Sequence, residues 1–121
     1  DGVESFLAKE HHFQEEFLDM KIVCEVVENV ESAVKHIEKY SSKHTEVIVS
    51  ENRDNINYFL TNITSAVVNV NASTRFTDGA MFGFGAEIGI STQKLHARGP
   101  MGLDELTTYK YLVEGNYATR N

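Results

Sequence analysis

Apolar residues follow two different periods along the first part of the chain. Three short runs, residues 20–27, 46–49 and 66–71, are rich in β-branched apolar residues, which is typical of buried strands. Between these runs, over residues 30–40 and 53–63, apolar residues recur every three or four positions. This spacing predicts two amphipathic helices that turn one face toward a core.

Polar residues in front of each predicted helix suit its N-cap. Asn29 precedes the first helix, and either Ser50 or Asn52 can cap the second. The order strand, helix, strand, helix, strand, with short links, implies parallel pairing through right-handed crossovers. The sequence therefore predicts an α/β fold built on a parallel three-stranded β-α-β-α-β layer.

The periodicity stops between residues 72 and 104. This Gly-rich stretch carries apolar anchors such as Phe76 and Leu95, so we interpret it as a long functional loop rather than a disordered segment. Residues 107–113 then regain strong strand propensity. Because this run follows a long loop, we expect a C-terminal strand that pairs with another chain and gives a homo-oligomer.

Length and charge narrow the classes of function. With 121 residues and a formal net charge of −7, we expect one domain over residues 1–121 and no nucleic-acid partner. No apolar run approaches the roughly 20 residues that span a bilayer, and no leader segment opens the chain, so we expect no membrane partner. Cys24 is the single cysteine, which excludes an intrachain disulfide and fits a cytoplasmic location.

The cysteine, the glycine-rich run and the histidines could each belong to a reactive or binding site, but their neighbouring residues do not fit one. Cys24 lies inside an apolar run, where cysteine usually behaves as a small buried hydrophobe rather than a nucleophile. Residues 83–89 resemble a dinucleotide glycine fingerprint, but no strand feeds them and no helix follows, so we interpret them as a tight loop. We predict no metal site, because ligand spacing is absent among the five histidines: His11, His12, His36, His44 and His96.

The bland interpretation of one histidine is structural. His44 closely follows the first predicted helix, where it can complement the negative end of the helix dipole.

An anion site is predicted directly after the third strand. Ser73, Thr74 and Arg75 lie there, at the carboxyl edge where open α/β sheets bind ligands. Two hydroxyls and a guanidinium suit a carboxylate or a phosphate. The residues alone leave a second interpretation open, in which Arg75 pairs with Asp78 or Glu87 and only holds the loop.

Several long runs resemble the C-terminal part of the gamma-glutamyl phosphate reductases, also called glutamate-5-semialdehyde dehydrogenases, of the aldehyde dehydrogenase superfamily. The match covers roughly residues 13–115. It includes part of residues 27–48 and is most distinctive in four runs: residues 71–79, 82–92, 96–100 and 106–110.

This resemblance implies an oxidoreductase that reduces gamma-glutamyl phosphate to glutamate-5-semialdehyde with NADPH in proline biosynthesis. The family's catalytic cysteine lies in a motif upstream of the matching residues, and Cys24 does not match it. Residues 1–121 are therefore expected to be a partial domain, with the C-terminal part of the catalytic domain and an oligomerisation strand. The cofactor domain and nucleophile are expected to be absent, so we predict no catalytic residue here and no turnover by the isolated chain.

The resemblance also implies roles for particular residues. Glu16 resembles the superfamily glutamate that accepts hydrogen bonds from the nicotinamide ribose of NADP, with Glu15 as the adjacent rival. Most of the NADP site would lie outside this chain. Phe82 resembles the aromatic residue of a Phe-Gly pair near the acyl pocket.

The predicted anion site gains a specific ligand from the same resemblance. Ser73, Thr74 and Arg75 resemble the loop that anchors the amino-acid end of the substrate, while Arg98 competes for the anion contact. A second class of function stays open beside the enzyme, namely a stand-alone, non-catalytic α/β module for anion binding or protein interaction.

Overall fold

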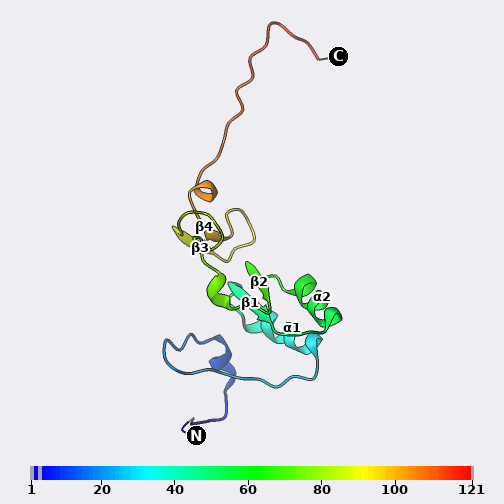
Figure 1. Cartoon of the computed structure of the whole chain (residues 1–121), viewed down its shortest axis with the longest axis vertical. Helices are drawn as coiled ribbons and strands as arrows, with labels where there is room; N and C mark the ends of the chain where they lie inside the picture. Colours follow the sequence, from blue (N-terminus) through cyan, green and yellow to red (C-terminus); the bar gives the residue numbers. More distant parts are fainter. Residues whose placement is uncertain (1, 3, 121) are drawn as a thin grey trace.

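The computed structural model describes residue 2 and residues 4–120. Its helices and strands cluster in the middle of the molecule, and the C-terminal residues run away from them as an extended trace (Figure 1). No helix within the described residues is long and apolar enough to cross a membrane. The elements in chain order are η1 (Glu10–Gln14), α1 (Val30–Tyr40), β1 (Thr45–Ile48), α2 (Arg53–Asn62), β2 (Val67–Val70), η2 (Thr74–Phe76), β3 (Gly89–Ser91), β4 (Gly99–Met101) and η3 (Asp104–Leu106).

The centre of the fold is a β-α-β unit with a second helix beside it. Strands β1 and β2 pair in parallel, with Thr45 opposite Val67 and Ile48 opposite Val70, and α2 connects them. Both predicted helices and the two predicted strands around α2 are confirmed, with boundaries shifted by a residue or two at most.

The helix caps follow from polar side chains. The Asn29 side chain accepts a 2.8 Å hydrogen bond from the backbone N–H of Ser32, as expected. Asn52 caps α2 by accepting from two backbone N–H groups. Ser50, the alternative cap, instead accepts a hydrogen bond from the backbone N–H of Asn52 and so supports the cap.

The hydrophobic core lies where the two helices meet one face of the sheet. Val34 of α1 packs with Phe59 of α2 and Ile63, and all three are at most 6% exposed. From the sheet, Ile48 and Val68 pack against this cluster. Within the described residues the core is small for a chain of this length, because few large apolar side chains are buried.

The predicted first strand, residues 20–27, is wrong for this chain. The segment is extended but forms no strand within the described residues, and Met20 and Val26 are 99% and 95% exposed. Cys24, expected to be buried, is exposed as well. An apolar run forms a strand only where its backbone can hydrogen-bond to the edge of a sheet. Residues 20–27 pair with neither edge of the β1–β2 sheet. The parallel layer therefore has two strands, not three.

The Gly-rich stretch contains more regular structure than predicted. Strands β3 and β4 form a short antiparallel ribbon, with Gly89 opposite Met101 and Ser91 opposite Gly99. Glycine is required at position 79, because a Cβ atom there would lie 2.4 Å from the carbonyl oxygen of Ala86. The stretch is thus a folded loop whose turns cross closely.

The C-terminal run, residues 107–113, forms no strand in the single chain described here. Its side chains are open to solvent, with Tyr109 77% and Val113 90% exposed. Pairing with another copy is not tested by one chain and stays a prediction.

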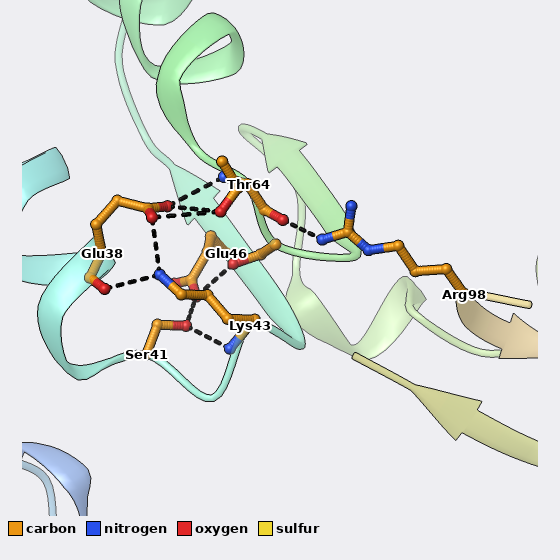
Figure 2. Close-up of polar contacts among 7 residues, drawn as sticks. Glu38, Ser41, Lys43, Glu46, Thr64 and Arg98 are labelled. Carbon is orange, nitrogen blue, oxygen red and sulfur yellow. Dashed lines mark hydrogen bonds and ion pairs between the residues drawn. The ribbon is translucent and has the colours of Figure 1, made fainter. Parts of the chain in front are cut away.

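A network of polar side chains joins α1, the connection between α2 and β2, and the residue before β4 (Figure 2). Glu38 of α1 accepts a 3.1 Å hydrogen bond from the backbone N–H of Thr64 and forms a 3.0 Å ion pair with Lys43. Arg98, next to β4, donates to the carbonyl oxygen of Thr64. One carboxylate therefore links α1 to the α2–β2 connection, and that connection in turn holds the loop that leads to β4.

A second carboxylate closes the same region. Glu46 of β1 accepts hydrogen bonds from the hydroxyls of Ser41 and Ser65, which lie before β1 and before β2 (Figure 2). These bonds satisfy a partly buried charge on the core face of the sheet.

The pH dependence of stability tests the Glu38 contact. The hydrogen bond from Lys43 lowers the pKa of Glu38 below its ordinary value of 4.5. A carboxyl whose pKa is lowered by folding adds stability above its unfolded-state pKa, and this is lost as pH falls through the folded-state pKa. We expect Glu38→Gln to cost about 1 kcal/mol of unfolding free energy at pH 7, and this difference to close below pH 4.5.

The measurement is urea unfolding followed by circular dichroism at a series of pH values. Glu51→Gln is the matched control, because Glu51 is exposed and forms no ion pair within the described residues. A pH-independent difference for Glu38→Gln, or an equal effect in both variants, would contradict the assigned contact.

Candidate functional site

An open cleft lies at the carboxyl ends of β1 and β2, where the sequence predicted a ligand site. Its volume is about 720 Å³. Ser73 and Thr74 line it, as expected for residues that directly follow β2. The lining consists of the strand ends and the two connections that leave them: Val47, Val49, Ser50, Glu51, Asn71, Ala72, Ser73 and Thr74.

Asn71 shapes this cleft, although sequence reasoning did not single it out. Its side-chain amide donates to the carbonyl oxygen of Ser50 and accepts from the backbone N–H of Ser50, both at 2.9 Å. Its backbone has a φ of 51°, a left-handed conformation that asparagine tolerates better than most residues. One side chain thus joins the connections that follow β1 and β2, and so fixes the floor of the cleft.

Ser73 has a local role beside its place in the cleft. Its hydroxyl accepts a 3.2 Å hydrogen bond from the backbone N–H of Arg75 and caps η2. A hydroxyl that accepts one bond still has a proton to donate. Ser73 can therefore hold the turn and offer a donor to an anion at the same time.

Arg75 is exposed and does not itself line the cleft. The alternative in which it pairs with Asp78 or Glu87 is wrong for the described residues, where no such ion pair forms. Instead, Asp78 accepts from the backbone N–H groups of Ala80 and Met81, and Glu87 accepts from the backbone N–H of Gly79. The carboxylates of Asp78 and Glu87 are thus bonded to the loop backbone, which leaves the guanidinium of Arg75 available.

The structure does not bring Arg98 to the same place. Its guanidinium bonds to the Thr64 carbonyl, before β2, whereas Ser73 and Thr74 follow β2. Arg98 is thus bound at the start of that strand, whereas Arg75 follows its end in the chain. Phe82 also stands apart from the cleft lining; it is 41% exposed and meets Phe84 edge-on at 6.0 Å between ring centroids.

Glu16 lines a second open cleft, between the N-terminal segment and α1. Its rival Glu15 lines the same cleft, so the geometry does not separate the two. Among the other lining residues are Val23, His36, Thr45 and Thr92.

The wall of this second cleft is η1, which docks onto the end of α1. Glu10 forms a 2.8 Å ion pair with Lys39, and the Lys39 hydrogen bond lowers the pKa of Glu10. Phe13 meets the rings of His36 and Tyr40, with centroid separations of 4.8 and 5.3 Å. These contacts fix the backbone just before Glu15 and Glu16.

Comparisons with known proteins point to one kind of enzyme. No protein-family model matches the chain. It is 60% identical over 115 residues to a gamma-glutamyl phosphate reductase of Azobacteroides pseudotrichonymphae genomovar. CFP2, and 61% identical over 109 residues to one of Caldanaerobacter subterraneus subsp. tengcongensis. A crystal structure of gamma-glutamyl phosphate reductase from Thermotoga maritima matches 94% of the chain at 57% identity with a TM-score of 0.88. The resemblance to this family is confirmed.

The alignments cover nearly all of this chain but only a small part of each relative. The two alignments cover 95% and 90% of this chain but 27% and 26% of the relatives, and the solved structure is covered to 28%. The chain thus spans about a quarter of the length of the gamma-glutamyl phosphate reductases it matches. The likeness establishes an α/β fold like that of the matching structure.

The structure adds contacts that bear on two of the histidine predictions. At the end of α1, the ammonium of Lys43 donates a 2.9 Å hydrogen bond to the carbonyl oxygen of Glu38, whereas Nδ1 of His44 forms a hydrogen bond with the Thr45 hydroxyl. The absence of a metal site stays a prediction; beside it, ligand atoms of His11, His12 and Glu15 lie within 4.8 Å of one another. The folded η1 turn creates this proximity, which the spacing rules for histidine did not capture.

The role of Asn71 can be measured through stability. Asn71→Ala removes both bonds to Ser50 and leaves the left-handed backbone without the polar side chain that compensates for it, so we expect a loss of about 2–3 kcal/mol of unfolding free energy. Asn71→Gly relieves the backbone strain, so it should recover part of this loss.

Asn57→Ala is the matched control, because Asn57 lies exposed on α2 and alanine is a better helix former there. Chemical denaturation of the three variants gives the comparison. If Asn71→Ala is as stable as Asn57→Ala, the amide bridge does not hold the two strand ends together.

Proposed function

We propose that this chain is the C-terminal portion of an NADPH-dependent oxidoreductase that converts gamma-glutamyl phosphate to glutamate-5-semialdehyde and phosphate. This reaction would place it in the biosynthesis of proline in the cytoplasm. The observation that carries the proposal is the 55–61% identity to proteins named gamma-glutamyl phosphate reductase, over at least 90% of the chain.

The substrate cleft in this proposal lies at the carboxyl ends of β1 and β2. Gamma-glutamyl phosphate carries a carboxylate at its amino-acid end, which needs hydrogen-bond donors and positive charge. The Ser73 and Thr74 hydroxyls line the cleft, and the Arg75 guanidinium follows with no ion pair to a described residue. We assign these three residues to the carboxylate, and Phe82 to the neighbourhood of the acyl group.

The second cleft would receive part of the cofactor. Glu16 lines it and follows a backbone that η1 and α1 hold in place. A carboxylate accepts hydrogen bonds from a diol, so we assign Glu16 to the nicotinamide ribose of NADP. Most contacts to NADP would come from residues that this chain does not contain.

No residue of this chain is assigned to the covalent chemistry. The reduction of an acyl phosphate through a thioester needs a positioned thiolate. Cys24 is exposed on an extended segment and has no hydrogen-bond partner within the described residues. In this proposal the nucleophile and the cofactor domain belong to the preceding part of the enzyme, so residues 1–121 alone would be inactive.

Substitution of Arg75 tests the substrate assignment in the complete enzyme. Arg75→Lys keeps the charge but loses the planar fork, so kcat/KM for gamma-glutamyl phosphate should fall about 30-fold, equivalent to about 2 kcal/mol, while the KM for NADPH stays unchanged. Steady-state kinetics with each substrate varied in turn separates the two effects.

Arg98→Lys is the comparison, because Arg98 already bonds to the Thr64 carbonyl. Unchanged kinetics in Arg75→Lys together with damaged substrate use in Arg98→Lys would assign the anion to Arg98. A complete wild-type protein that binds the substrate but does not reduce it would favour the non-catalytic binding module instead.

Assembly tests the proposed role of the C-terminal run. Residues 107–113 are exposed and unpaired in the single chain, and Tyr109 and Tyr111 stack edge-on at 5.3 Å. An unpaired strand rich in tyrosine and threonine adds readily to an exposed sheet edge. We expect the chain to form a homodimer or larger species at micromolar concentration, measured by sedimentation equilibrium.

Tyr111→Pro removes one backbone donor from this run and should shift the mass toward the monomer without changing the circular dichroism of the β1–α2–β2 unit. Lys110→Ala is the matched control, since it leaves every backbone donor in place. A monomeric wild type, or a proline variant of unchanged mass, would contradict this assembly.

A further inference from the structure

We propose that His11, His12 and Glu15 form a binding site for a divalent late first-row metal ion such as Zn²⁺. One ligand atom from each of the three side chains lies within 4.8 Å of the others, and the two imidazole rings are 4.2 Å apart between centroids. The site is formed by η1 and by Glu15, which follows it; Glu15 also lines the second cleft, but the site lies outside the substrate cleft and no step of the proposed reaction uses it.

The donor set suits such an ion. Two imidazole nitrogens and one carboxylate oxygen are a common zinc ligand set, and bonds of about 2.0–2.2 Å place tetrahedral ligands about 3.4 Å apart. The present separations, up to 4.8 Å, close by small side-chain rotations, because His11 and Glu15 are exposed. Three protein ligands would leave at least one coordination position to water.

The backbone that carries the three ligands is held in place. The residues between and before them contact α1, through the 2.8 Å Glu10–Lys39 ion pair and the packing of Phe13 on His36. Preorganised ligands lose less conformational entropy on binding, which favours a real site over a chance cluster.

One contact sets a limit on the affinity. Nδ1 of His12 accepts a 3.1 Å hydrogen bond from the backbone N–H of Lys9. Coordination through Nδ1 replaces this bond directly, while coordination through Nε2 moves the ring proton to Nδ1 and breaks it as well. Because the bond is lost either way and the site is open to water, we expect micromolar rather than tighter binding.

Calorimetric titration of Zn²⁺ into the untagged, chelator-treated chain at pH 7 tests the site. We expect one ion bound per chain, and a roughly tenfold or greater loss of affinity in each of His11→Gln, His12→Gln and Glu15→Gln. His96→Gln and Glu4→Gln are the matched controls, because both residues are exposed and lie outside the cluster. These controls should bind as tightly as the wild type.

Nitrogen NMR of the imidazole rings gives a second readout that does not depend on heat. Zn²⁺ should shift the ring nitrogens of His11 and His12 and leave those of His36, His44 and His96 in place. Absence of binding at hundreds of micromolar Zn²⁺, affinity that persists when all three ligands are replaced, or shifts confined to the other histidines would each overturn the proposal. Circular dichroism of every variant shows that the fold is retained.

Discussion

The packing of Phe59 against Val34 and Ile63 is the contact on which the rest of the described structure depends. It presses α1 and α2 against the face of the sheet that carries Ile48 and Val68. Few other large side chains are buried among the described residues, so this apolar contact supplies most of the hydrophobic stabilisation. The polar network of Glu38, Lys43 and Thr64 (Figure 2) follows this contact along the chain, since Thr64 comes directly after Ile63.

The positions of both clefts depend on the strands and helices that pack in this core. The first lies where β1 and β2 end, because parallel strands bring their carboxyl ends to one edge and Asn71 ties the following connections together. The second lies where η1 rests on α1. Neither cleft is enclosed by this chain, which fits a chain that covers about a quarter of its relatives' length.

The spacing of apolar residues predicted those elements that interactions between residues close in sequence determine. The helices over α1 and α2, the cap at Asn29, and the strands β1 and β2 follow from apolar spacing and polar caps within a few residues. Residues 20–27 have the same kind of pattern, but apolar spacing records that a segment is suited to burial and not what covers it. The β3–β4 ribbon was missed because its three-residue strands, rich in glycine, have no alternating pattern.

Some residues of the candidate site could likewise be predicted from the sequence, and others could not. Ser73 and Thr74 could be predicted because they follow a strand, whereas the choice between Arg75 and Arg98 could not, since only the fold shows that Arg98 bonds to the Thr64 carbonyl before β2. Asn71 acts across 21 residues on the backbone of Ser50, and contacts at that separation leave no periodic signal. The cluster of His11, His12 and Glu15 likewise depends on a turn that histidine spacing alone does not reveal.

The exposed segment between η1 and α1 can be cut by a protease, and after the cut only noncovalent contacts would join η1 to α1. Lys21 is the lysine within this segment and is open to solvent, so a trypsin-like protease would nick the backbone there before it cut the helices. After such a nick, η1 would be joined to α1 only through the Glu10–Lys39 ion pair and the ring contacts of Phe13. The wall of the second cleft that η1 forms would then depend on these noncovalent contacts alone.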